Sequence, residues 1–179
     1  KQWRERLLES KPQFSNVRLI AAVPRLFFAR EREQILRQIA FWEQEHPGVL
    51  SGWLVGNPGG LQLLREAKVT GPIYADYPLN CFNRYTVQGL LELKLHQITL
   101  SPELNYEQLN QLDTPMEQLE VMVHGAWPLM VSEHCVVGAR QGNSTGQKNC
   151  QAACRGQKFY LRDRLGYRFP LEMDEHCRM

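Results

Sequence analysis

Four cysteines near the end of the chain have the type and spacing to bind a metal. They are Cys135, Cys150, Cys154 and Cys177. Three residues separate Cys150 from Cys154, so one turn of chain can bring both sulfurs to a single centre. Four thiolates suit either zinc or an iron–sulfur cluster. We therefore predict that these four side chains are the ligands of one metal centre.

The spacing of the cysteines helps to distinguish the two metals. Structural zinc usually takes its thiolates from two Cys-x-x-Cys pairs. This chain has one Cys-x-x-x-Cys and two isolated cysteines. The uneven spacing favours an iron–sulfur cluster, with zinc as the alternative. Nearby basic residues would offset the negative charge of such a cluster, and these are Arg140, Lys148, Arg155 and Arg178.

Unrelated free thiols are a third interpretation of the cysteines. A free cysteine is usually a small buried hydrophobic residue. That description suits the fifth cysteine, Cys81, which has Leu79, Phe82 and Tyr85 as near neighbours in the sequence. It suits the other four poorly, because the chain around them is polar and rich in glycine.

Polar residues at the ends of predicted strands are the candidates for substrate contact. Asn57, Asp76 and Asn80 are predicted to bind substrate, and Glu103 and His124 are predicted to be catalytic. A histidine beside the cysteine-rich segment can transfer a proton or hydrogen-bond a substrate. The alternatives are a His124 that bonds a backbone carbonyl and a Glu103 that caps the following helix.

Short β-rich segments alternate with helical ones through the first two thirds of the chain. The expected strands are 17–23, 50–55, 73–75, 97–100 and 119–123, and the expected helices are 30–45, 59–67, 83–93 and 105–112. Strict alternation implies an α/β fold with a parallel sheet covered by helices. Because no Gly-x-Gly-x-x-Gly follows a strand and the strand ends are polar, we expect part of a (β/α) TIM-like barrel rather than a dinucleotide-binding sheet.

Five strands cannot close an eight-stranded barrel. We therefore expect the remaining strands to come from the rest of a longer protein or from a partner chain, or the sheet to be an open half-barrel. The chain begins at Lys1 without an initiator Met, which agrees with a longer protein. The sequence divides into a partial barrel, 1–127, and an irregular Cys-rich tail that would bind the cluster, 128–179.

The tail also contains a predicted β-hairpin. Segments 159–163 and 167–171 flank a turn that ends in Gly166. From Cys135 to Met179 there are eight Lys and Arg against four Asp and Glu. Four arginines of the tail are candidates to bind RNA phosphates, with a solvated basic face as the alternative, and these are Arg155, Arg162, Arg164 and Arg168.

Composition excludes several classes of protein. The chain has 179 residues, 43% of them hydrophobic and 22% charged, with a net charge of +2, so disorder and coiled coils are not indicated. No apolar run approaches the roughly 20 residues of a membrane helix. The odd number of cysteines and the lack of a signal peptide argue against a secreted disulfide framework. We expect a cytoplasmic location and no membrane contact.

Several motifs together resemble the peptidase U32 family. They are Glu-Val-Met-Val-His-Gly-Ala at 120–126, Ser-Glu-His-Cys at 132–135 and Cys-Gln-Ala-Ala-Cys-Arg at 150–155. The resemblance extends over nearly all of the chain from Val49. It implies the C-terminal portion of a (β/α) barrel and a [4Fe–4S] cluster on the four tail cysteines. One departure is Pro128, which stands where many relatives have a further cysteine.

The resemblance leaves several functions open. The family is named for collagenase-like peptidases, and other members take part in hydroxylating tRNA, ribosomal RNA or the ubiquinone ring. This chain has neither a Gly-x-Ser-x-Gly nucleophile elbow nor a His-Glu-x-x-His zinc motif. We therefore expect a [4Fe–4S]-dependent enzyme that hydroxylates RNA or an aromatic ring. The alternatives are a peptidase that acts on collagen-like or unfolded peptides and a zinc-stapled binding module.

Overall fold

The structure is a computed structural model that describes residues 2–10, 16–141, 154, 156–174 and 178–179. The chain divides into two compact units, Lys1–Gly125 and Ala126–Met179. Each unit is described by itself below. No helix within the described residues has the length and apolar character needed to cross a membrane.

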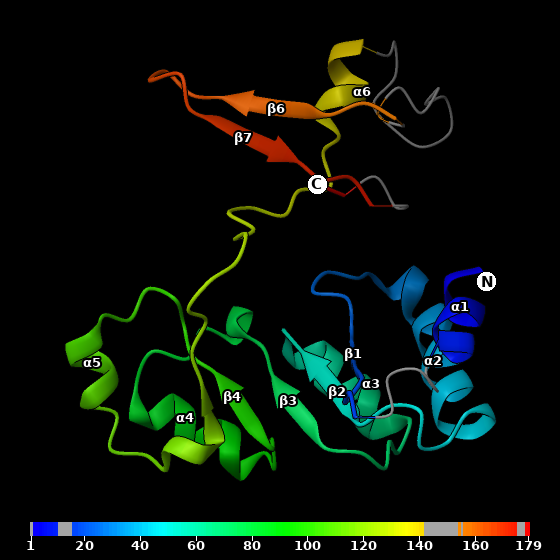
Figure 1. Ribbon diagram of the computed structural model, residues 1–179, viewed down its shortest axis with the longest axis vertical. Helices are drawn as coiled ribbons and strands as arrows, with labels where there is room; N and C mark the ends of the chain where they lie inside the picture. The colour runs from blue at the N-terminus through cyan, green and yellow to red at the C-terminus, as the bar shows by residue number, and fades with distance from the viewer. Residues whose placement is uncertain (1, 11–15, 142–153, 155, 175–177) are drawn as a thin grey trace. The chain divides into compact units, whose positions relative to one another are not determined.

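The first unit alternates strands with helices (Figure 1). Its strands are β1 (Ile20–Ala22), β2 (Gly52–Val55), β3 (Ile73–Ala75), β4 (Gln97–Thr99) and β5 (Leu119–Glu120). Its α-helices are α1 (Gln2–Ser10), α2 (Arg32–Ala40), α3 (Pro58–Glu66), α4 (Arg84–Glu92) and α5 (Tyr106–Asn110). Short 3₁₀ turns lie at Ala29–Glu31, Tyr77–Leu79 and Met116–Gln118.

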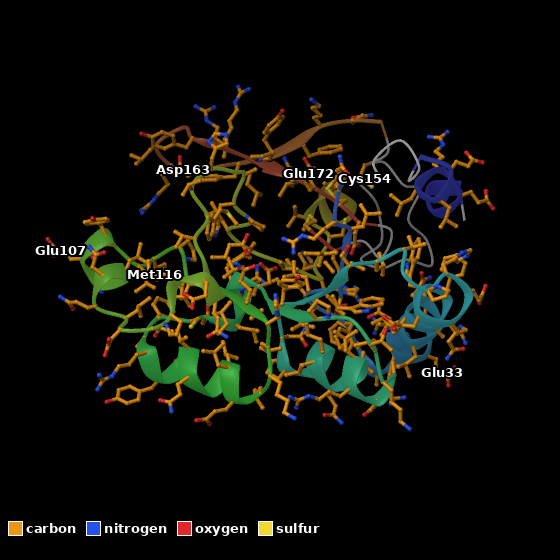
Figure 2. The ribbon with its side chains drawn as sticks, turned by 60° about the horizontal axis from the view of Figure 1, so that its bottom comes forward. Glu33, Glu107, Met116, Cys154, Asp163 and Glu172 are labelled. Carbon is orange, nitrogen blue, oxygen red and sulfur yellow. The ribbon has the colours of Figure 1, made fainter. Side chains whose placement is uncertain are left out.

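The five strands form one parallel sheet in chain order, β1-β2-β3-β4-β5. The register pairs Ala21 with Trp53, Leu54 with Tyr74 and Ile98 with Leu119 at successive strand contacts. Crossovers between parallel strands are almost always right-handed, so an unreversed strand order keeps the helices on one face. Figure 2 shows α3 and α4 along one face of the sheet. The predicted α/β fold with a parallel sheet is confirmed, and no closed barrel is formed by the described residues.

Asparagine side chains fix where three helices begin. The Asn57 side chain accepts a hydrogen bond from the Gly60 N–H at 2.7 Å, and Pro58 begins α3 with a backbone already shaped for a helix. Asn83 accepts from the Thr86 N–H at the start of α4, at 3.0 Å. Asn105 forms a capping box at the start of α5. These caps separate each helix from the strand before it, so the strand ends lie on short, defined loops.

The core lies between the sheet and its helices. Val55, Leu64, Val87 and Ile98 are each 0% exposed. The central strands β2, β3 and β4 are mostly buried, whereas β1 and β5 at the two edges are more exposed. Cys81 is 0% exposed, which confirms the interpretation as a buried hydrophobic residue, and burial raises its pKa to about 11.

The helix predicted at 30–45 is divided by a tertiary contact. After α2 the chain continues as a π-helical turn, Phe41–Glu45. There the Glu43 carboxylate accepts bonds from the Trp53 indole N–H at 2.7 Å and from the Thr70 N–H and hydroxyl at 3.0 and 2.9 Å. Burial raises the pKa of Glu43, but these hydrogen bonds outweigh burial and hold it below its usual value. The hydrophobic periodicity of segment 30–45 cannot reveal this contact, because Trp53 belongs to β2.

Two further differences from the predicted elements concern the last strand of the sheet and two additional helices. Strand β5 ends at Glu120, although the apolar run to Val123 predicts a longer strand. Val121 and Val123 are exposed, so an apolar sequence here does not mean burial. Helices α1 and α6 (Val136–Gln141) are present but were not predicted.

The second unit contains the predicted β-hairpin. Strands β6 (Phe159–Arg162) and β7 (Arg168–Leu171) pair antiparallel, with Tyr160 opposite Pro170 and Arg162 opposite Arg168. The turn is closed by Asp163, whose Oδ1 accepts from the N–H groups of Leu165 and Tyr167. Gly166 has a φ of +91°, a conformation that L side chains rarely adopt.

A matched pair of valines tests where the core lies. We expect Val55→Ala to lower the free energy of unfolding by about 2 kcal/mol, because it removes two buried methyl groups and leaves a cavity. Val123, which is 92% exposed, is the control. Val123→Ala should change the free energy by less than about 0.5 kcal/mol. Urea unfolding measures both, and equal midpoints for the two variants would contradict the position of the core.

Candidate functional site

The carboxyl ends of the parallel strands meet at one edge of the sheet and carry most of the predicted site residues. Asn57 follows β2, and Asp76 follows β3. Ser101–Glu103 follows β4, and Glu120 ends β5. Parallel strands direct these positions to the same edge. The edge lies entirely within the first unit.

Asn57 connects two loops of this edge. Besides capping α3, its amide nitrogen donates to the Arg25 carbonyl at 2.9 Å and to the Pro24 carbonyl at 3.3 Å. Both amide hydrogens and one acceptor are therefore used within the protein. The side chain holds the segment after β1 against the start of α3. Its predicted contact with substrate remains a prediction.

Asp76 lies at the centre of a small charged group. Its Oδ1 accepts from the Tyr77 N–H at 2.8 Å and caps the following 3₁₀ turn. Burial raises the pKa of Asp76 above its usual value, and nearby Glu120 adds to the increase. The Tyr77 N–H and the positive charge of Arg25 act in the opposite direction. The net effect is a carboxyl group that holds its proton more tightly than an exposed aspartate does.

Arg25 and Tyr77 complete one side of the group. An Nη of Arg25 donates to the Tyr77 hydroxyl at 3.1 Å, and the guanidinium carbon lies 5.5 Å from the centre of the same ring. Arg25 is exposed, so its charge is available to a ligand. On the other side, the buried hydroxyl of Thr99 donates to Glu120 Oε2 at 2.8 Å.

Sequence reasoning missed Arg25, Tyr77 and Glu120. Arg25 and Tyr77 follow strands, so the rule that selected Asp76 would also have selected them, whereas Glu120 lies inside the strand predicted at 119–123. Together the charged group can hold an anionic ligand against Arg25 and offer the Asp76 carboxyl for proton exchange.

The other three predicted residues lie at the surface. The backbone of Asn80 has the left-handed conformation, with a φ of +53°, and its N–H donates to the Tyr77 carbonyl. Glu103 is exposed, and Asn105 rather than Glu103 caps α5, so the capping alternative for Glu103 is wrong. His124 is exposed and lies four residues beyond the end of β5. Their catalytic and binding roles remain predictions.

The candidate metal ligands lie in the second unit. Cys135 directly precedes α6, is half-buried, and its Sγ accepts from the Gly138 N–H at 3.2 Å. Cys154 is also half-buried. Cys150 and Cys177 lie outside the described residues. Among the described residues no three His, Cys, Asp or Glu side chains group closely enough to hold a metal, so the four-cysteine centre remains a prediction.

The segment before Cys135 is joined to the end of the chain. The Ser132 N–H donates to the Met179 carbonyl at 2.8 Å, and the Met179 N–H donates to the Ser132 carbonyl at 3.0 Å. Arg178 is 7% exposed, and its Nε lies 3.6 Å from Glu133 Oε1. The backbone N–H of Arg178 donates to Asp174 Oδ1 at 2.8 Å. Ser132, three positions before Cys135, and Met179, two positions after Cys177, are therefore held together.

Comparison with known proteins places the chain in a family. The sequence model described as peptidase family U32 matches residues 11–175. That range is most of the chain, and the chain therefore belongs to this family. The resemblance found in the motifs is confirmed.

Two curated proteins are similar over part of the chain. The tRNA hydroxylation protein P of Escherichia coli K12 is 30% identical over 105 residues, which are 57% of this chain and 23% of that protein. The protein of the same name from Haemophilus influenzae is 29% identical over the same proportions. The match thus spans less than a quarter of the length of these relatives. The solved U32 peptidase Mk0906 has a TM-score of 0.47 at 15% identity, covering 64% of this chain and 47% of that one.

The raised pKa of Asp76 predicts a pH-dependent stability difference. A carboxyl that binds its proton more tightly when folded stabilises the fold fully below its unfolded pKa and loses this contribution as pH rises through the folded pKa. Asp76→Asn cannot lose a proton, so it does not have this pH dependence. We therefore expect the free energy of unfolding of Asp76→Asn, minus that of the wild type, to be larger at pH 7 than at pH 3. Urea unfolding at several pH values measures this.

The control for this experiment is Asp113→Asn, the same change at an exposed side chain. An identical pH response of the two variants would show that the environment of Asp76 is not special. NMR titration of the Asp76 carboxyl checks the direction of the pKa shift directly.

Proposed function

We propose that the chain is part of an RNA-hydroxylating protein of the U32 family. The similarity to two tRNA hydroxylation proteins carries this proposal, together with membership of the family. RNA therefore takes precedence over an aromatic small molecule as the substrate. A protein with such a substrate would act in the cytoplasm.

The sheet is proposed to be part of a (β/α) barrel. A doubly wound sheet reverses its strand order at a switch point, whereas a barrel adds each new strand beside the last. The order β1 to β5 runs without reversal, which supports the barrel. Strands β1 and β5 would then pair with strands from the rest of the protein or from a partner chain.

The four tail cysteines are proposed to hold a [4Fe–4S] cluster, with zinc as the alternative. The surroundings of Cys135 fit a thiolate ligand, because the Gly138 N–H already points at its sulfur and a backbone donor stabilises negative charge there. The Ser132–Met179 hydrogen bonds support a common location for the segments of Cys135 and Cys177. When bound, such a cluster supplies electron-transfer chemistry.

The residues of the sheet edge are proposed to bind and orient the nucleotide. Arg25 would contact a phosphate, and Asp76 would exchange a proton with the substrate. Asn57 holds the backbone of Arg25 in place. Asn80 would contact substrate, and Glu103 and His124 remain the proposed residues for proton transfer.

A matched pair of cysteine variants tests the metal centre. We expect Cys135→Ala to lose most of the bound iron, because a four-thiolate cluster needs each ligand. Cys81→Ala is the control, since Cys81 is buried in the core of the first unit, and this variant should keep its iron. Iron and acid-labile sulfide are measured per chain after anaerobic purification. Zinc in place of iron in the unchanged protein would favour the zinc alternative.

The proposed activity is tested in the organism that carries the gene. Its deletion should remove a nucleoside that is heavier by one oxygen atom from tRNA or ribosomal RNA, as measured by mass spectrometry of RNA digests. The wild-type gene should restore this nucleoside, and the Cys135→Ala gene should not. Unchanged RNA, together with cleavage of denatured collagen by the purified protein, would establish the peptidase instead.

A further inference from the structure

The β-hairpin of the second unit has one face on which two arginines lie directly opposite each other. The register pairs Arg162 of β6 with Arg168 of β7. Like charges at opposite positions of an antiparallel pair are destabilising. No ion pair with either arginine is formed by the carboxylates of the described residues. This arrangement leaves two adjacent positive charges without a counterion among the residues that the structure describes.

Backbone geometry shows that these two side chains are held especially close. Pro170 has no N–H, and the Asp163 N–H bonds the Tyr167 carbonyl at 3.1 Å. Hydrogen-bonded and non-hydrogen-bonded pairs alternate along an antiparallel ladder, so Arg162 and Arg168 form a non-hydrogen-bonded pair. In such pairs the Cα atoms are about 4.5 Å apart and the side chains are closest. One bound anion can therefore contact both guanidinium groups.

The glycine turn leaves room for the Arg162 side chain. A Cβ placed at Gly166 would lie 3.5 Å from an Nη of Arg162. The Arg162 guanidinium therefore lies over the turn beside Gly166, in space that a side chain at position 166 would limit. Arg164, in the same turn, is also exposed and adds a third positive charge nearby.

An aromatic ring lies next to the arginine pair on the same face. Tyr160 is 49% exposed and is paired with Pro170, the next pair along this face of the hairpin. Side chains two residues apart on one strand are separated by roughly 6.8 Å. The ring and the arginine pair are therefore neighbours on this face, and one bound nucleotide strand can contact both. The other face carries Leu161 and Phe169.

The acidic residues of the hairpin do not neutralise this face. Asp163 alternates to the other face and is engaged by the N–H groups of Leu165 and Tyr167. Glu172 lies beyond the end of β7. Figure 2 shows Asp163 and Glu172 toward opposite ends of the hairpin. The positive potential of the arginine pair is therefore exposed to solvent.

We propose that the face formed by Tyr160, Arg162, Arg168 and Pro170 binds single-stranded RNA. The arginine pair binds a backbone phosphate through charge-assisted hydrogen bonds, and Tyr160 stacks on a base. An acidic peptide would satisfy the two charges but would make no use of the ring. The inference rests on the proposed function, since it names how the RNA substrate is held.

The test is binding of a fluorescent single-stranded RNA oligonucleotide of mixed sequence to the full chain, measured by anisotropy at several salt concentrations. The double variant Arg162→Gln/Arg168→Gln removes the charge pair and keeps the length of both side chains. For single strands each phosphate contact contributes about 0.7 to the slope of log K against log salt, so the double variant, which removes the one phosphate contact of the pair, should lower the slope by about 0.7. Its affinity at low salt should fall accordingly.

Variants at Tyr160 separate stacking from charge. Tyr160→Ala should weaken binding by about fivefold to a hundredfold, and Tyr160→Phe should bind like the wild type because the ring is kept. The control for net charge is Arg37→Gln/Lys68→Gln, which removes two exposed positive charges from the first unit. It should leave both affinity and salt slope near the wild-type values. Circular dichroism checks that each variant is folded.

The outcomes distinguish this inference from the proposed function. If the hairpin variants bind RNA like the wild type while RNA hydroxylation in cells depends on the protein, the hairpin inference is overturned and the function stands. If polyglutamate competes as well as RNA does, the face binds an acidic protein and the inference is also overturned. Loss of binding and of salt slope in the double arginine variant, with the control unchanged, supports it.

Discussion

The parallel direction of all five strands is the constraint on which the first unit depends. Parallel pairing requires a crossover after each strand, and the helices of these crossovers bury one face of β2, β3 and β4. The same pairing brings the carboxyl end of every strand to one edge. The charged group of Arg25, Asp76 and Glu120 is therefore assembled from residues almost one hundred positions apart in the sequence.

The parts of the fold that are encoded locally could be predicted from the sequence. Strand 73–75 was predicted with its observed limits because a proline precedes it and Asp76 caps the next turn. Helix 83–93 was close to α4 because Asn83 is its cap. The π-helical turn could not be predicted, because Glu43 is held by Trp53 and Thr70 from other elements. Helix α6 has only six residues and contains a glycine, which is too little for periodicity to show.

The candidate site shows the same division between local and distant information. Asn57 and Asp76 were found because strand ends are recognisable, but the two connections of Asn57 to the segment after β1 depend on the fold. In the second unit, the sequence identifies the cysteines and the hairpin. It does not show that the chain end returns to Ser132, a pairing that involves residues nearly fifty positions apart. Only the folded backbone brings those segments into contact.

Pro170 has a consequence for the way the hairpin behaves toward other strands. At a non-hydrogen-bonded position the backbone groups point outward, so the outer edge of β7 lacks a donor where a neighbouring strand would need one. An isolated two-stranded ribbon with apolar side chains on one face is otherwise a template for edge-to-edge aggregation. The missing donor, together with the charge of Arg168 beside it, keeps this edge from being extended into a larger sheet.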